Sequence, residues 1–151
     1  MALLSPITQK IPLMVGAGNH EHSDSFTEYN LRFKATDAYT GTSSLSHTNH
    51  YYSFNEGLIH YIMINMEVYS YPSDAANGPS PFTAAKQLAW LEDDLKRANE
   101  DEQRKSTPWI VLMGHRPWYT VEKNGFPAID DLACLYGVDL YLTGHVHNYQ
   151  R

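Results

Sequence analysis

Three apolar segments of this chain end in the same way, with a glycine placed directly before asparagine or histidine. Residues 11–15 lead into Gly18-Asn19-His20, residues 109–113 into Gly114-His115, and residues 138–142 into Gly144-His145-Val146-His147. Short apolar runs of this length predict buried strands, and sites in open α/β sheets lie beyond the carboxyl ends of strands. We therefore expect an α/β fold whose polar strand-end residues converge at one rim of a sheet. They are Asn19, His20, His115, His145 and His147.

The residue types at these strand ends favour metal binding. Neutral imidazole nitrogens and an amide oxygen suit zinc, iron or manganese, and glycine lets the backbone turn sharply beside a ligand. Any one of these histidines alone is more often a hydrogen-bonded loop or core residue, whereas three strand ends with the same signature indicate a site. Arg116, which follows His115, could contact an anion or brace its loop.

The remaining histidines, the tryptophans and the single cysteine lack this strand-end context. We expect these histidines to be surface or structural residues, and the tryptophans to pack in the core or at its rim. They are His22, His47, His50, His60, Trp90, Trp109 and Trp118. Cys134 lies in an apolar, helix-like segment, which predicts a buried structural thiol rather than a nucleophile.

The first half of the chain contains one clear hairpin pattern. Residues 50–54 and 58–66 predict two strands joined by a tight turn at Asn55-Glu56-Gly57. Residues 22–49 are polar and predict a long surface excursion with one helical turn, and the prolines within residues 70–82 predict a loop.

The second half alternates helix and strand patterns, which indicates α/β layering. Residues 83–98 predict a helix that Ser80 or Thr83 caps and that a Glu92–Lys96 pair supports. Its apolar face is formed by Ala84, Leu88, Leu91 and Leu95. Residues 99–107 predict a charged linker, and residues 128–136 predict a short helix that ends at Gly137.

Composition limits the remaining possibilities. A length of 151 residues suggests a single domain over residues 1–151, and 42% hydrophobic content is enough for a core. A net charge of −6 disfavours binding to nucleic acid or to an anionic membrane surface. No apolar stretch reaches the roughly 20 residues of a membrane helix. The sequence has no signal-peptide pattern and no Asn-x-Ser/Thr sequon, so localisation stays open.

Longer segments around the strand ends resemble one known family. They are Val15-Gly16-Ala17-Gly18-Asn19-His20-Glu21, residues 109–119 and residues 136–149. In this order they are similar to the metallophosphoesterase superfamily, and most closely to the purple acid phosphatases. The resemblance implies a partial catalytic domain over residues 1–151. Its fold would be part of an α/β/β/α sandwich that lacks the N-terminal strands and the last strands.

The resemblance also implies a role for each strand-end residue. Asn19, His115 and His145 would bind one metal, His147 would bind the other, and His20 would contact the phosphate or assist the leaving group. The implied cofactor is a binuclear centre of iron with zinc, manganese or iron. The implied reaction is hydrolysis of small phosphate monoesters at acidic pH by a metal-activated water. Neither nucleic acid nor a membrane is an implied partner, and the oligomeric state is not implied.

The sequence departs from the family at several places. The family's two Gly-Asp motifs supply carboxylate ligands and a tyrosinate, and this chain contains no Gly-Asp dipeptide. Residues 119–125 contain no histidine where the family often has one, and Gln150 stands where glutamate is usual. We therefore expect a fragment of a larger catalytic domain with exposed sheet edges and marginal stability. It should hold at most one divalent ion weakly and have little or no phosphatase activity.

Two other functions stay open on the sequence alone. The chain could belong to a different metallophosphoesterase, such as a phosphodiesterase or a nucleotidase. It could also be a non-catalytic metal-binding or interaction domain, since the Gly-Asp motifs are absent.

Overall fold

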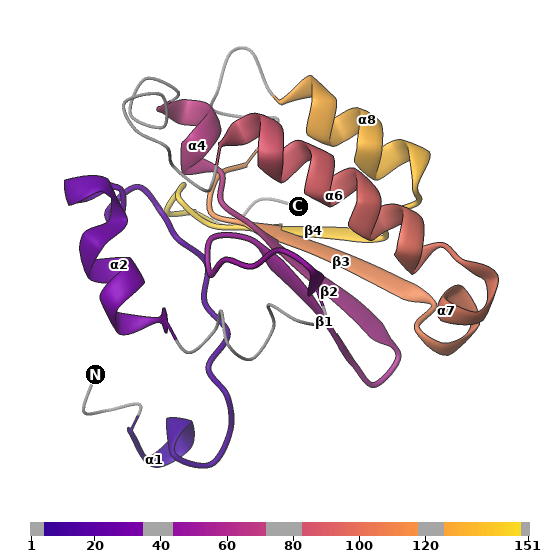
Figure 1. Ribbon diagram of the computed structural model, residues 1–151, viewed down its shortest axis with the longest axis horizontal. Helices are drawn as coiled ribbons and strands as arrows, with labels where there is room; N and C mark the ends of the chain where they lie inside the picture. Colours follow the sequence, from indigo (N-terminus) through magenta and orange to yellow (C-terminus); the bar gives the residue numbers. More distant parts are fainter. Residues whose placement is uncertain (1–4, 35–43, 72–82, 118–125, 149–151) are drawn as a thin grey trace.

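The structure is a computed structural model that describes residues 5–34, 44–71, 83–117 and 126–148. Its strands form one four-stranded sheet in the order β1-β2-β3-β4 (Figure 1). The strands are β1 Tyr52–Glu56, β2 Ile59–Ile64, β3 Trp109–Gly114 and β4 Leu140–Thr143. The first pair is antiparallel, and β2, β3 and β4 run parallel to one another. The carboxyl ends of these three strands therefore meet at one edge.

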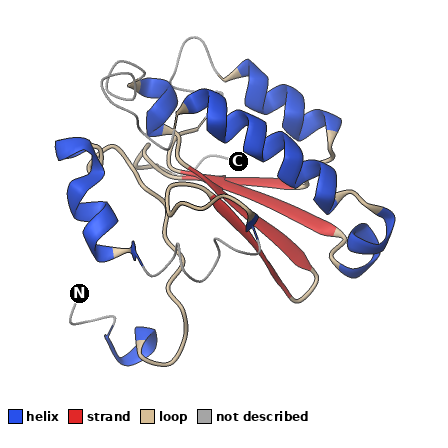
Figure 2. Cartoon of the chain, viewed as in Figure 1, coloured by secondary structure: helices blue, strands red, loops and turns tan. Residues whose placement is uncertain are grey.

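Helices surround this sheet unevenly. Two of them, α6 and α8, lie side by side across one face of the sheet, and α7 lies beyond one end of α6 (Figures 1 and 2). The helices are α1 Ser5–Thr8, η1 Ser23–Phe26, α2 Thr27–Arg32, α4 Glu67–Ser70, α6 Ala84–Ala98, α7 Asp101–Ser106 and α8 Pro127–Leu135. The predicted α/β class is confirmed as a mixed sheet flanked by helices.

The main core lies between the sheet and α6. Alternate residues of β2 and β3 point toward the helices, because side chains of a strand alternate between its two faces. The sheet contributes Ile62, Ile64, Ile110 and Leu112, and α6 contributes Leu91 and Leu95, all fully buried. Burying an aliphatic side chain of this size stabilises the fold by roughly 1.5–3 kcal/mol, so this layer holds the sheet in place.

The predicted hairpin is confirmed, with its turn one residue later than expected. Residue Glu56 pairs with Ile59, so Gly57 and Leu58 make the turn. Gly57 has a φ of +58°, a left-handed conformation that glycine adopts without steric cost. This geometry explains why the turn centres on the glycine.

The predicted helix at residues 83–98 is also confirmed. Thr83 is its N-cap, and the Thr83 hydroxyl oxygen accepts a hydrogen bond from the Lys86 amide at 3.2 Å. Lys96 pairs with Glu92 at 2.8 Å, as the spacing predicts. The buried face differs from the predicted one, because it includes polar residues that bond to the sheet and its loops. It consists of Gln87, Trp90, Leu91, Asp94, Leu95 and Ala98.

We expect Thr83→Ala to lower the free energy of unfolding by about 1 kcal/mol, since one amide at the helix start then has no acceptor. Urea denaturation followed by circular dichroism measures the change. Thr83→Ser keeps the hydroxyl and serves as the matched control. An equal loss in both variants would contradict the capping role.

Two sequence predictions about the second half of the chain are wrong. Residues 101–106 form α7 rather than a linker, because acidic residues begin this helix and basic residues end it, which suits the helix dipole. Cys134 is exposed, since α8 buries Ile129 and Ala133 instead. Trp109 is 54% exposed at the start of β3, so it lies outside the core.

The predicted strand at residues 11–15 is wrong as well. This segment forms no strand, and Pro12 could not donate to a ladder. The Val15 carbonyl accepts hydrogen bonds from the hydroxyls of Tyr29 at 3.2 Å and Tyr52 at 2.8 Å. Two side chains therefore hold this segment beside the sheet.

The polar region at residues 22–49 contributes to a small second core rather than only to the surface. Phe26 and Tyr29, from η1 and α2, are buried and pack with Ala17. Gly137 follows α8 with a φ of +64°, so the helix stop at this glycine is confirmed. Several sequence predictions lie outside the described residues, namely those for Ser80, Trp118, Gln150, residues 72–82 and residues 119–125.

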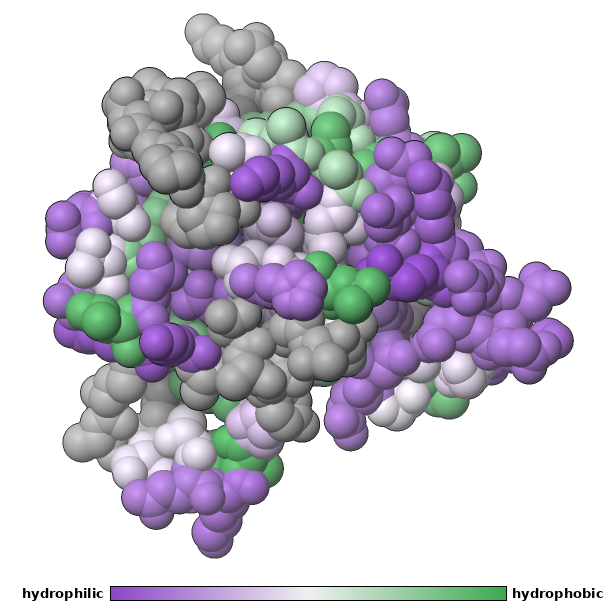
Figure 3. All heavy atoms as spheres, in the orientation of Figure 1, coloured by the Kyte–Doolittle hydropathy of each residue, from purple (hydrophilic) through white to green (hydrophobic). Residues whose placement is uncertain are grey.

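The surface is strongly polar on the face that Figure 3 shows over α7 and the adjoining end of α6. The exposed charged residues of α6 include Asp93 and Lys96. Within the described ranges, no helix combines the length and the apolar character needed to cross a bilayer.

Candidate metal centre

Three of the five predicted site residues meet at the carboxyl edge of the sheet. His115 follows β3, His145 follows β4, and Asn19 comes from the segment that the two tyrosines anchor. The Asn19 Oδ1 atom lies 2.7 Å from His115 Nε2 and 3.2 Å from His145 Nδ1. The two ring nitrogens lie 3.2 Å from each other. We call these three atoms the donor triangle.

The size of the donor triangle fits a single metal ion. Ligands about 2.1 Å from a metal lie roughly 3.0 Å apart at right angles, as in an octahedral site, and roughly 3.4 Å apart in a tetrahedral site. The two sides of 3.2 Å fall within this range, and the side of 2.7 Å is a few tenths of an ångström shorter. Two imidazoles and an amide oxygen are also chemically suitable for zinc, iron or manganese. Within the described residues, no group of three or more His, Cys, Asp or Glu side chains could hold a metal ion, so the candidate set is two histidines and one asparagine.

Backbone contacts tie the two histidine loops together. The His115 carbonyl accepts hydrogen bonds from the Gly144 amide at 3.0 Å and from the Thr143 hydroxyl at 3.1 Å. His145 itself has a φ of +64°, a left-handed conformation that costs a non-glycine residue about 1 kcal/mol or more. This backbone conformation costs some stability, and it places the His145 ring in the triangle.

Glycine before Asn19 has a steric reason. A Cβ atom at Gly18 would lie 2.9 Å from Cγ of His115 and 3.0 Å from two other atoms of its ring. The Gly18 amide also donates to the Glu21 carboxylate at 2.9 Å, which shapes the loop. The glycine thus lets Asn19 and His115 come within bonding distance.

The other two predicted site residues lie outside the triangle. His20 and His147 are exposed, and neither side chain bonds to another described residue. Both are next to or near the triangle in sequence, His20 beside Asn19 and His147 two positions after His145. Their predicted roles stay predictions.

Burial affects the protonation of the triangle. Partial burial lowers the pKa of His115, and the neighbouring His145 and Arg116 act in the same direction while Glu67 and Glu21 oppose it. A lower pKa keeps the imidazole neutral, which is the form that binds metals.

A buried ion pair beside the triangle answers the open question about Arg116. The guanidinium forms hydrogen bonds of 2.9 and 3.0 Å to the carboxylate of Glu67 and lies 3.4 Å from His145 Nε2. Of the two alternatives, loop bracing fits this geometry. Sequence reasoning gave Glu67 no role, although its position just past an apolar strand was a usable signal.

The remaining histidines have structural surroundings, as predicted. His50 is buried between Asn30 at 2.8 Å and Asn65 at 2.9 Å, and burial lowers its pKa to about 3. His22 stacks on Tyr71 with 4.1 Å between the ring centroids, and His47 is exposed.

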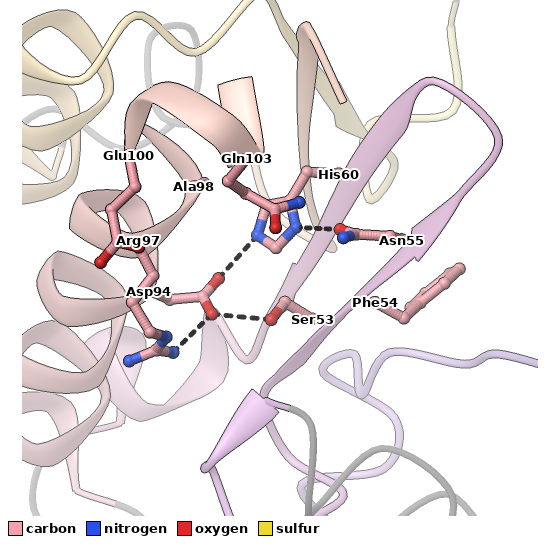
Figure 4. A pocket seen from close by; sticks show the side chains of 9 residues that line it. All are labelled: Ser53, Phe54, Asn55, His60, Asp94, Arg97, Ala98, Glu100 and Gln103. Carbon is pink, nitrogen blue, oxygen red and sulfur yellow. Dashed lines mark hydrogen bonds and ion pairs between the residues drawn. The ribbon is translucent and has the colours of Figure 1, made fainter. Parts of the chain in front are cut away.

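A second polar cluster lines a pocket of about 520 Å³ between the hairpin and α6 (Figure 4). Asp94 accepts hydrogen bonds from Ser53 at 2.8 Å, from Arg97 at 2.8 Å and from His60 at 3.0 Å. His60 also bonds to Asn55 at 2.6 Å. Because the serine donates to the aspartate rather than to the histidine, this cluster does not activate a nucleophile. It joins the hairpin to the helix.

Comparison with known proteins gives one consistent result. The profile of the calcineurin-like phosphoesterases matches residues 1–149. The chain is 36% identical to probable purple acid phosphatase 20 of Arabidopsis thaliana over 99% of this chain and 34% of that protein. It is 32% identical to acid phosphatase type 7 of Homo sapiens over 100% of this chain and 35% of that protein.

Solved structures also match this chain. One of them is a purple acid phosphatase from yellow lupin seeds, with a TM-score of 0.49 and 22% identity over 67% of this chain and 18% of that chain. The chain spans about a third of the length of the first two curated relatives.

Proposed function

The chain belongs to the calcineurin-like phosphoesterase family, and on that premise we propose that it is the metal-binding part of an acid phosphatase that hydrolyses phosphate monoesters. The observation that carries the proposal is the donor triangle, in which Asn19, His115 and His145 gather at one sheet edge with sides of 2.7 to 3.2 Å. These residues would hold one divalent ion.

The two exposed histidines would complete the chemistry around the triangle. His147 would bind the second metal of a binuclear centre, which would combine iron with zinc, manganese or a second iron. His20 would contact the phosphate or give a proton to the leaving group, since it follows Asn19 and is open to solvent. Metals in such a centre polarise the phosphate and activate water for in-line attack.

The donors present in this chain limit what it does alone. An amide oxygen and two imidazoles carry no negative charge as metal ligands, so Asn19, His115 and His145 would not offset the charge of a bound cation. The sequence contains no Gly-Asp dipeptide, the motif that carries the carboxylate ligands in the resembled family. We therefore infer that this chain holds a single divalent ion weakly and turns over phosphate monoesters slowly or not at all.

Two measurements test this function. Calorimetric titration with zinc should give a stoichiometry of one ion per chain. Phosphate release from p-nitrophenyl phosphate with zinc, iron or manganese should stay close to background. Turnover near that of an intact acid phosphatase would contradict the inference that the metal centre is incomplete. Absence of metal binding would favour a non-catalytic interaction domain. Faster cleavage of bis(p-nitrophenyl) phosphate would favour a phosphodiesterase.

Gly18→Ala is expected to weaken zinc binding roughly tenfold, because the new Cβ would displace the His115 ring from the triangle. Gly144→Ala is the matched control, since a Cβ there would lie 3.7 Å from His115 Nδ1, an ordinary van der Waals distance. Calorimetric titration of both variants measures the effect. A larger loss for the control would show that the steric explanation is wrong.

A further inference from the structure

The ion pair beside the donor triangle is buried and highly directional. Arg116 donates from Nε to both Glu67 carboxylate oxygens, at 2.9 and 3.0 Å, and from Nη2 to Oε2 at 2.9 Å. The two side chains are 7% and 0% exposed. Taking two charges out of water costs about as much as their attraction returns, so such a pair is a weak source of stability. Its geometry is therefore more informative than its energy.

The pair lies where three parallel strands end. Glu67 follows β2, Arg116 follows β3, and His145 follows β4. The guanidinium thus has the Glu67 carboxylate on one side and Nε2 of His145 on the other, at 3.4 Å. A planar guanidinium fixed by a carboxylate has little freedom to move, so the ring beside it meets a rigid neighbour.

This neighbour determines which nitrogen of His145 faces the triangle. Since Nε2 faces Arg116, Nδ1 faces Asn19 Oδ1 and His115 Nε2, each at 3.2 Å. The φ of +64° at His145 is a conformation that persists only where the surroundings hold it. Tyr141 adds a further restraint from β4, because its hydroxyl donates to the Arg116 carbonyl at 2.6 Å.

We propose that Glu67 and Arg116 form a positioning pair that keeps the His145 ring aimed at the donor triangle before an ion binds. The inference rests on the proposed metal-binding function. Neither residue contacts the ion or the substrate. The pair acts through His145, by reducing the ordering that this loop would otherwise undergo when a ligand arrives.

One effect opposes this gain. When Nδ1 of His145 binds a metal, the ring proton moves to Nε2 and faces the guanidinium, which can only donate. The 3.4 Å separation lies beyond the usual 2.7–3.2 Å range of N–H hydrogen bonds, so the hydrogen bond given up there is weak. We expect the ordering of the His145 loop to be the larger effect, so removal of the pair should weaken metal binding.

The double variant Glu67→Leu with Arg116→Met is the sharpest test. Replacing a buried ion pair by apolar residues of similar volume is often neutral for stability, so the variant should fold. Calorimetric titration with zinc should show affinity about tenfold below that of the unmodified chain. Arg97→Met is the control, because Arg97 pairs with the buried carboxylate of Asp94 in a cluster outside the donor triangle. The zinc affinity of this variant should stay within about twofold of that of the unmodified chain.

A spectroscopic measurement separates positioning from a general structural effect. In the metal-free chain, ¹⁵N correlation spectra of the histidine rings should show one tautomer for His145, with its proton on Nδ1. The double variant should show a mixture of tautomers. Arg116→Lys keeps the charge and removes the planar fork, so it should fall between the two, and it decides the matter if the double variant fails to fold.

The outcomes separate this inference from the proposed function. Unchanged zinc affinity together with unchanged His145 spectra in the variants would overturn the positioning role. If the unmodified chain binds no zinc, the proposed function fails, and the ring spectra of the metal-free chains still decide whether the pair orients His145.

Discussion

His115→Ala is expected to weaken zinc binding by about two orders of magnitude or more. The His115 ring supplies two of the three sides of the donor triangle, to Asn19 at 2.7 Å and to His145 at 3.2 Å. Loss of a residue that only supports a ligand already costs about 10–100-fold in affinity, so loss of a ligand should reach the upper end of that range or exceed it. Calorimetric titration of the folded variant measures the change.

His47→Ala is the matched control for this variant. His47 is exposed and lies outside the triangle, so its removal should leave zinc affinity unchanged within about twofold. If His115→Ala binds zinc as tightly as the unmodified chain, the ion is held elsewhere, and the exposed His20 and His147 become the first candidates.

Acidification from pH 7 to pH 4 is expected to remove roughly 3 kcal/mol of folding free energy through His50 alone. Burial lowers the pKa of His50 from its ordinary value of 6.5 to about 3. Below pH 6.5, His50 therefore binds a proton in the unfolded chain but stays neutral in the folded chain. The stabilising contribution is complete above that pH and is lost progressively as the pH falls toward 3.

The surroundings of His50 explain this preference for the neutral ring. Nε2 donates to Asn30 Oδ1 at 2.8 Å, and Nδ1 accepts from the Asn65 side-chain amide at 2.9 Å. Urea denaturation at pH 7 and pH 4 measures the loss. The variant His50→Gln should be less stable at pH 7 yet show a flatter pH dependence, whereas His47→Gln should retain the full slope. A flat profile for the unmodified chain would contradict the assignment.

Elements with short-range causes could be predicted from the sequence. The turn at Gly57, the cap at Thr83 and the helix stop at Gly137 depend on a few neighbouring residues, and all three appear as expected within one position. The family could also be identified, because a glycine directly before asparagine or histidine after three apolar segments is an unusual combination. Each of these predictions depends on local chemistry.

Predictions that depend on distant partners were less successful. Residues 11–15 have the composition of a strand, but the Val15 carbonyl bonds to two tyrosine hydroxyls and not to a neighbouring strand. Cys134 lies in an apolar stretch, yet the other side of α8 is buried. The Glu67–Arg116 pair joins residues 49 positions apart, and no local pattern marks such a pairing.

Asn19 belongs to an early segment of the chain, whereas His115 and His145 follow late strands of the sheet. Their contact in the donor triangle has a consequence for chain entropy. Asn19 lies 96 positions from His115 and 126 positions from His145. An ion held by all three would close these long loops as a cross-link does, which restricts the unfolded chain most when the loop is long. Zinc should therefore protect the amides of residues 11–34 against hydrogen exchange, although most of them contribute no ligand. In this chain a bound ion would cross-link the segment that contains Asn19 to the end of the last strand.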